Sequence, residues 1–200
     1  MRKNTASQKS GGTVREIVVP CITLTVTCVI IALLLAVTNG ITAPKIAELQ
    51  VQTQAESRQM VLPDAETFSE EKTVSLDGAN YTYCEGLDAQ GNCAGYVFTT
   101  SAKGYGGDVV VMSGVDPNGK VTGIQTIELN ETAGLGMKAA EEDFLSQFEG
   151  KTAGIGVAKN DPGANDIQAL TGATITSRAV TDSVNVALEL YQLVKEGGAQ

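Results

Sequence analysis

The longest pattern in the sequence is an uncharged, apolar run from Ile17 to Thr38. It is rich in Val, Ile, Leu and Thr, and as an α-helix it would be about 33 Å long at roughly 1.5 Å per residue. That length crosses the hydrocarbon core of a bilayer. We predict one transmembrane helix over residues 17–38. We expect it to be retained as an anchor, because a cleaved signal peptide has a shorter apolar core.

Charged residues flank this run unequally. Four basic residues and one acidic residue, Glu16, lie in the preceding tail of residues 1–16. Because basic residues favour the cytoplasmic side of a membrane, we predict a cytoplasmic N-terminus, a single pass through the cell membrane and an extracytoplasmic remainder.

The pattern turns polar after the apolar run. Asn39-Gly40 predicts a break, and Pro44 starts an amphipathic helix that extends to about Met60, before Pro63 stops it. We therefore predict a stalk helix and linker over residues 39–71.

Short alternating runs between turn residues are typical of β-strands, and they fill the chain from Lys72 to Glu128. Asp88-Ala-Gln-Gly-Asn92 and Asp116-Pro-Asn-Gly119 are hairpin turns by composition. The strands that they join are predicted at residues 80–85 with 95–100, and 108–115 with 121–128.

The C-terminal part changes to mixed structure. We predict a helix from Lys138 to Phe148, an irregular glycine-rich stretch from Gly150 to Gly163 and a short strand from Asp166 to Leu170. The last helix carries one apolar stripe that should cover the sheet. Its members are Val180, Val184, Ala187, Tyr191 and Val194. The fold class is α+β, with an antiparallel-sheet domain at residues 72–200.

The amino-acid composition excludes several kinds of catalytic and metal-binding site. The chain of 200 residues has a formal net charge of −9, four Cys, no His and no Trp. Without His there is no Ser-His-Asp triad, no His-ligated metal and no haem His ligand. The acidic excess disfavours nucleic acid as a partner. We predict no catalytic residues and no metal site, so redox work would need a bound organic cofactor.

Residues Leu170 to Ser177, reading LTGATITS, join the predicted strand to the last helix. The first amides of a helix have no intrahelical partner and lie at the positive end of the helix dipole, so they bind phosphate well. Thr176 and Ser177 add hydroxyls in that turn. Gly172 and Ala173 keep bulk away from the hydroxyl of Thr174. Ordinary N-capping explains a single such tetrapeptide equally well.

The eight residues resemble the attachment sequence of the covalent-FMN family, which includes subunits of the RnfG and NqrC types. The family pattern is Ser/Thr-Gly-Ala-Ser/Thr-x-Ser/Thr-Ser, with FMN esterified through its phosphate to the second Ser/Thr. The resemblance implies that Thr174 carries the FMN and that Thr171 belongs to the same motif. Gln168 stands where many members have Asp, and Asp166 lies two residues further back.

A second stretch, Glu131-Thr-Ala-Gly-Leu-Gly136, lies between a predicted strand and a helix. It resembles the family's E-T-P-G-L-G loop beside the isoalloxazine ring, with Ala133 in place of Pro. The resemblance implies that the flavin is lined by Glu131, Thr132, Gly134, Leu135 and Gly136.

Two further residues are candidates near the flavin. Tyr105 lies among three glycines in a segment that resembles one in the same family. Arg178 falls one turn after Thr174 on the last helix, where it would reach the phosphate.

Cys84 and Cys93 lie on opposite arms of the first predicted hairpin. On the extracytoplasmic side they could form a disulfide or remain free thiols, and the sequence leaves both possibilities open.

The resemblance implies an electron-transfer subunit of the Rnf complex, which couples electron transfer between ferredoxin and NAD⁺ to Na⁺ or H⁺ movement. It also implies partner subunits of the A, B, C, D and E types and a flavin transferase that installs FMN from FAD. One alternative is an NqrC-type subunit of the Na⁺-translocating quinone reductase, although those chains are usually longer. Another is a membrane-anchored binding module without a cofactor.

Overall fold

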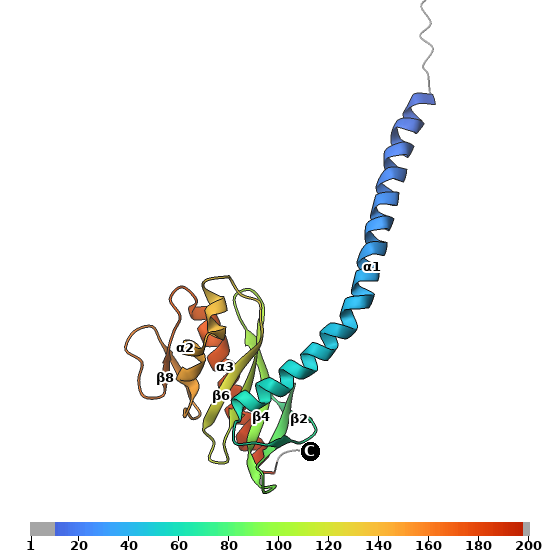
Figure 1. The fold of residues 1–200 in the computed structure, drawn as a ribbon. Coiled ribbons are helices and arrows are strands. Elements are labelled where there is room, and N and C mark those ends of the chain that lie inside the picture. Colours follow the sequence, from blue (N-terminus) through green and yellow to red (C-terminus); the bar gives the residue numbers. More distant parts are fainter. Residues whose placement is uncertain (1–10, 198–200) are drawn as a thin grey trace, which may run out of the picture. The chain divides into compact units, whose positions relative to one another are not determined.

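The structure, a computed structural model, describes residues 11–197, so most of the predicted tail of residues 1–16 lies outside the described part. The chain divides into two compact units, Met1–Val51 and Gln52–Gln200. The elements are shown in Figure 1, and their bounds are α1 (Gly11–Val61), β1 (Thr67–Phe68), β2 (Lys72–Leu76), β3 (Ala79–Leu87), β4 (Cys93–Lys103), β5 (Asp108–Val115), β6 (Val121–Leu129), η1 (Gly136–Ala140), α2 (Glu142–Leu145), η2 (Ser146–Phe148), β7 (Gly156–Ala158), β8 (Asp166–Gln168) and α3 (Thr174–Lys195).

Helix α1 is continuous, so the predicted break at Asn39-Gly40 is wrong. Pro44 has no N–H to donate to the carbonyl of Gly40, and this costs the helix a single backbone hydrogen bond. The helix nevertheless continues through this segment to Val61. Among the described residues, one span is long and apolar enough to cross a membrane: Ile17–Ala43, which is 27 residues long and has a mean hydropathy of 2.7 over an 18-residue stretch within it.

Threonine hydroxyls within this span are satisfied by the helix itself. Thr23 donates to the carbonyl of Val19 at 2.9 Å, and Thr25 donates to that of Cys21 at 2.8 Å. Thr38 does the same four residues back, at 2.9 Å. Because a polar group in hydrocarbon needs an internal partner, this back-bonding makes the threonines compatible with a bilayer.

The unit from residue 52 onward is built on an antiparallel sheet, which confirms the predicted fold class. Its strand order is β1-β3-β4-β5-β6, and β2 also pairs with β3. Both predicted hairpins are confirmed, β3 with β4 and β5 with β6. The turns are fixed by aspartates: Oδ1 of Asp88 accepts from the N–H of Asn92 at 2.8 Å, and Oδ1 of Asp116 accepts from that of Lys120 at 2.8 Å.

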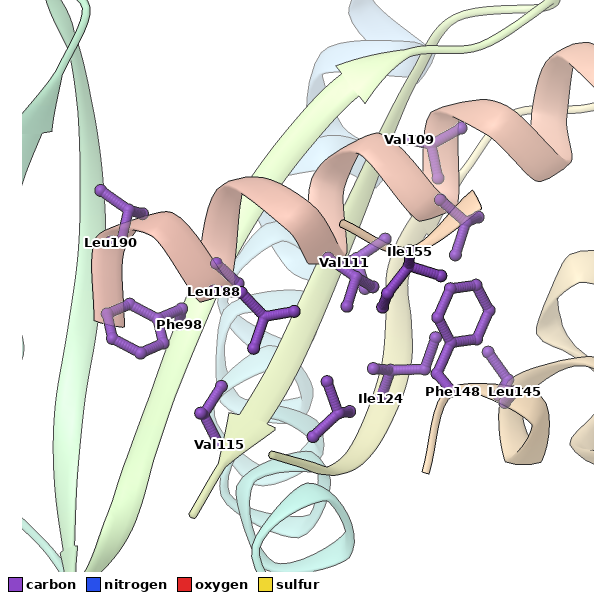
Figure 2. Close-up of a cluster of buried hydrophobic side chains, with 14 of the residues drawn as sticks. Phe98, Val109, Val111, Val115, Ile124, Leu145, Phe148, Ile155, Leu188 and Leu190 are labelled. Atoms are coloured by element: carbon purple, nitrogen blue, oxygen red, sulfur yellow. The ribbon is translucent and has the colours of Figure 1, made fainter. Parts of the chain in front are cut away.

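Helix α3 covers one face of this sheet. Four members of its predicted apolar stripe are buried, from Val180 to Tyr191, and Val194 at the end is half-buried. Figure 2 shows the interior between α3 and the sheet, where Leu188 of α3 lies near Phe98 of β4 and the β5 side chains of Val111 and Val115. Full burial of one such side chain stabilises a fold by about 1.5–3 kcal/mol. The Tyr191 hydroxyl donates to the carbonyl of Pro117 at 2.7 Å, which ties α3 to the β5–β6 turn.

A second, smaller apolar cluster forms where α1 ends, from Val61, Leu62, Ala65, Cys84, Val97 and Met112. The backbone comes very close here, since a Cβ on Gly114 would lie 2.0 Å from the carbonyl oxygen of Val61. Thr122 donates a hydrogen bond to the same carbonyl. Glycine at 114 is therefore needed for the end of α1 to pack on the sheet.

The segment after β6 differs from the single helix predicted for residues 138–148. Glu141 is extended, with φ −79° and ψ 143°, and it separates η1 from α2. The glycine-rich stretch also contains a strand that the sequence did not indicate, β7, which pairs in parallel with β8. This small second sheet leads into the turn before α3.

The first hairpin does not place its cysteines opposite each other. In the observed register Cys84 pairs with Val97, and Cys93 pairs with Leu87. Both thiols are free, with Cys84 buried and Cys93 exposed. The register therefore gives no support to the disulfide that the sequence left open.

Candidate functional site

A cavity of about 820 Å³ opens at the N-terminal end of α3. Its size falls in the range of ligand sites, roughly 300–1,000 Å³. Four separate segments of the chain supply its walls, and the lining residues are Tyr105, Glu131, Thr132, Leu135, Gly136, Lys159, Asn160, Ala169, Leu170, Thr171, Gly172, Ala173, Thr174, Ile175 and Thr176.

A tight turn delivers the chain from β8 to α3. The N–H of Ala173 donates to the carbonyl of Leu170 at 3.0 Å, and Gly172 has φ +79°. A turn with positive φ at its third position favours glycine. A Cβ on Gly172 would also lie 3.1 Å from Cδ2 of Leu135, so the turn packs against the loop of residues 131–136.

Helix α3 begins at Thr174 with Ala173 at its N-cap, and no side chain makes a capping hydrogen bond there. Alanine is a poor N-cap, typically costing about 1 kcal/mol relative to Ser, Thr, Asp or Asn. The first backbone amides of α3 thus lie at the cavity without a side-chain acceptor. Such amides, at the positive end of a long helix, form an anion site.

The hydroxyls of the motif differ in their surroundings. Thr174 is half-buried and Thr171 exposed, and both line the cavity. Thr176 is buried, with its Oγ1 only 2.9 Å from where a Cβ on Gly136 would stand. Ser177 is fully buried: its Oγ donates to the carbonyl of Ala173 and accepts from the N–H of Leu170, both at 3.0 Å. Ser177 therefore holds the turn in place and does not line the cavity.

Glu131 joins the two glycine-containing loops. Its Oε1 accepts a hydrogen bond of 2.7 Å from the N–H of Tyr105. A Cβ on Gly104 would lie 2.4 Å from the same oxygen, and a Cβ on Gly136 would lie 2.8 Å from Cβ of Glu131. The glycines at these positions are explained by the close approach of one carboxylate side chain.

Exposed apolar side chains surround the cavity. Tyr105 is 73% exposed, Ile175 54% and Leu135 45%. Met137, next to the lining residue Gly136, is 42% exposed. Large apolar side chains grouped on a surface mark a binding site more often than scattered ones do. This rim suits a flat, partly apolar ligand.

Besides Ser177, two more predicted residues lie outside the cavity lining. Arg178 is exposed and is not among the residues that line the cavity. Gly134 is also outside the lining, and its φ of +77° serves the turn of its loop. Sequence reasoning missed Lys159 and Asn160, which line the cavity just after β7. Within residues 11–197, no group of three or more Cys, Asp or Glu is arranged to hold a metal ion.

Comparison with known proteins relates this chain to a protein family. The family described as FMN-binding domain matches residues 104–189, which include Tyr105, the loop of residues 131–136 and the turn before α3. The G subunit of the proton-translocating ferredoxin:NAD(+) oxidoreductase complex of Clostridium ljungdahlii is 38% identical over 168 residues, covering 83% of this chain and 86% of that protein.

Two more proteins extend the comparison. The G subunit of the Na(+)-translocating ferredoxin:NAD(+) oxidoreductase complex of Acetobacterium woodii is 41% identical over 174 residues, covering 79% of this chain and 83% of that protein. The crystal structure of the NqrC protein of the Na(+)-translocating NADH-quinone reductase from Parabacteroides distasonis has a TM-score of 0.53 at 20% identity, covering 69% of this chain and 92% of that chain. This last likeness shows a shared fold.

Proposed function

Because this chain belongs to the family of G subunits of ion-translocating ferredoxin:NAD(+) oxidoreductase (Rnf) complexes, we propose that it is an electron-transfer subunit with FMN attached to Thr174. The observation that carries the proposal is the position of Thr174. Its side chain lines the same cavity as the loop of residues 131–136, at the first residue of α3.

The donor groups around the cavity fit a flavin phosphate. Uncapped amides at the start of α3 suit the phosphate, and the small residues Gly172 and Ala173 leave its approach open. Tyr105 and Leu135 are exposed at the rim, where they would lie against the ring system and exclude water from it. When bound, FMN supplies reversible uptake and release of electrons, and the protein supplies attachment and orientation.

Attachment is proposed as a group transfer from FAD, carried out by a separate flavin transferase. Thr174 Oγ forms a bond to the phosphorus of the FMN half, the bond from that phosphorus to the oxygen shared with the AMP half breaks, AMP leaves, and the threonine proton is released. Thr176 and Ser177 are too buried to react in this way. Two threonines of the motif are accessible, Thr171 and Thr174. We assign Thr174, because the small residues Gly172 and Ala173 before it leave its hydroxyl open to approach and because it is the second Ser/Thr of the family pattern.

The same family membership supports a proposal for the partners and the location of this chain. One apolar helix in the described part, together with relatives from ion-translocating complexes, supports a membrane-anchored protein. We propose that the domain faces the extracytoplasmic side, because the basic residues lie before the helix. Subunits of the A, B, C, D and E types are the proposed partners, and electrons pass between them through this chain.

Two alternatives are less well supported. An NqrC-type subunit shares the fold, but the identity to the solved NqrC is 20%, against 38% and 41% to two G subunits. The subunits that co-purify with this chain would separate these two. A binding module without a cofactor is disfavoured by the match of residues 104–189 to the FMN-binding domain family.

Flavin fluorescence in a denaturing gel tests the proposal. Co-expressed with a flavin transferase, wild-type protein and Thr171→Ala should fluoresce at the position of the chain, and Thr174→Ala should not. Fluorescence retained in Thr174→Ala would overturn the assignment of Thr174. A dark wild-type band would overturn covalent attachment altogether.

A further inference from the structure

Lys159 lies beside the chain segment that leads to Thr174, although fifteen positions separate them in the sequence. In the parallel pairing of β7 and β8, Ala158 is opposite Gln168. The next hydrogen bond runs from the N–H of Ala169 to the carbonyl of Ala158, at 2.8 Å. Lys159 is therefore level with Ala169, and both line the cavity.

The loop between β7 and β8 is held at several points. Oδ2 of Asp166 accepts from the N–H of Gly163 at 2.9 Å. Nζ of Lys151 donates to the carbonyls of Ala164 and Asp166, at 2.6 Å and 3.1 Å. A Cβ on Gly156 would lie 2.2 Å from Oδ1 of Asp166, so the carboxylate packs directly on β7. These contacts hold β7 and the far end of the loop, on either side of Lys159 in the sequence.

Lys159 is the basic residue among the described residues that line the cavity. Of the described residues that line it, Glu131 and Lys159 carry a full charge, and Oε1 of Glu131 is bonded to the N–H of Tyr105. Lys159 is exposed and has no ion pair or side-chain hydrogen bond within the described chain. Arg178, the cation that spacing alone suggested, does not line the cavity.

We propose that the Lys159 ammonium pairs with the flavin phosphate at Thr174, as a positioning residue for the cofactor. This inference rests on the proposed function. A lysine is a compact point charge that commonly binds phosphate, and here it would add to the dipole of α3. The negatively charged phosphodiester would then be held from two sides, by the amides of α3 and by the β7–β8 loop.

Lysine acetylation with an N-hydroxysuccinimide ester tests the pairing, read by mass spectrometry of peptides. The full chain in detergent is compared with and without co-expression of a flavin transferase. Lys159 should react about two- to fivefold more slowly in the flavin-bearing chain, the protection expected for an exposed ion pair. Lys138, which is exposed and outside the cavity lining, is the internal control and should react equally in both.

The salt dependence of the protection distinguishes an ion pair between Lys159 and the phosphate from simple shielding of Lys159 by the flavin ring. At about 1 M salt, where the Debye length is about 3 Å, the protection of Lys159 should largely disappear. Equal labelling in the two chains, or protection insensitive to salt, would overturn the pairing. The intact mass of the chain distinguishes a failure of this inference from a failure of the proposed function. If the chain carries flavin and Lys159 is unprotected, only the lysine assignment is wrong. If the chain takes up no flavin, the proposed function is wrong as well.

Discussion

The backbone N–H of Tyr105 donates a hydrogen bond of 2.7 Å to Oε1 of Glu131. The two residues come from different loops, one between β4 and β5 and the other after β6. Glycines at 104 and 136 allow the carboxylate to pack between the loops. Glu131 therefore shapes the wall of the cavity, in addition to any contact with a ligand.

Replacing Glu131 tests this role. Glu131→Ala removes the acceptor, and because Tyr105 is exposed, water would replace part of what is lost. We expect a loss of about 1 kcal/mol in the free energy of unfolding, measured by chemical denaturation of the full chain in detergent. Glu131→Gln keeps an acceptor oxygen and should lose less than half as much. Equal losses would indicate that the negative charge matters, not the hydrogen bond.

Ser177 is predicted to support the turn before α3. In Ser177→Ala the N–H of Leu170 loses its acceptor in a buried place, which should cost about 1–3 kcal/mol. Thr171→Ala, at an exposed position of the same motif, should change the free energy of unfolding by less than about 0.5 kcal/mol. A thermal denaturation series of both variants checks the contrast. Comparable effects of the two would contradict the structural role of Ser177.

The cysteines of the first hairpin should differ in reactivity. Burial raises the pKa of the Cys84 thiol above its usual value, and the side chain is almost inaccessible, whereas Cys93 is exposed. In folded protein without reductant, a maleimide should label Cys93 and leave Cys84 unlabelled. After denaturation without reductant, both should be labelled fully. Persistent protection of the pair after denaturation would instead demonstrate a disulfide.

The β5–β6 turn should contribute to acid sensitivity. Partial burial pushes the pKa of Asp116 upward, but hydrogen bonds from Lys120 and Asn118 outweigh it and leave the pKa below its usual value. The stabilisation is then present above the unfolded-state pKa of about 3.9 and is lost as pH falls through the lower folded-state pKa. The stability gap between wild type and Asp116→Asn should shrink as pH is lowered from about 5 to about 2. A constant gap would contradict this linkage.

Local chemistry made much of the fold predictable. The hairpins follow from Asp88 and Asp116, whose carboxylates bond the amides of their own turns. The apolar stripe of α3 follows from helical periodicity alone. The strand β7 was not predictable in this way, because its three residues, Gly156–Ala158, are held by pairing with β8 and by Asp166.

The candidate site was predictable where a motif is contiguous and not where it depends on tertiary pairing. Residues 131–136 and 170–176 stand in continuous stretches, so their residue types could be read directly. Lys159 reaches the cavity only through the register of β7 and β8. Arg178 had the right spacing from Thr174, but it is not among the residues that line the cavity.

The mass of the intact chain, purified from its native host, tests the central claim most directly. Our account predicts an increase equal to one riboflavin phosphate less one water, located by fragmentation on Thr174. A chain of unmodified mass, or a flavin located on any other residue, would contradict it.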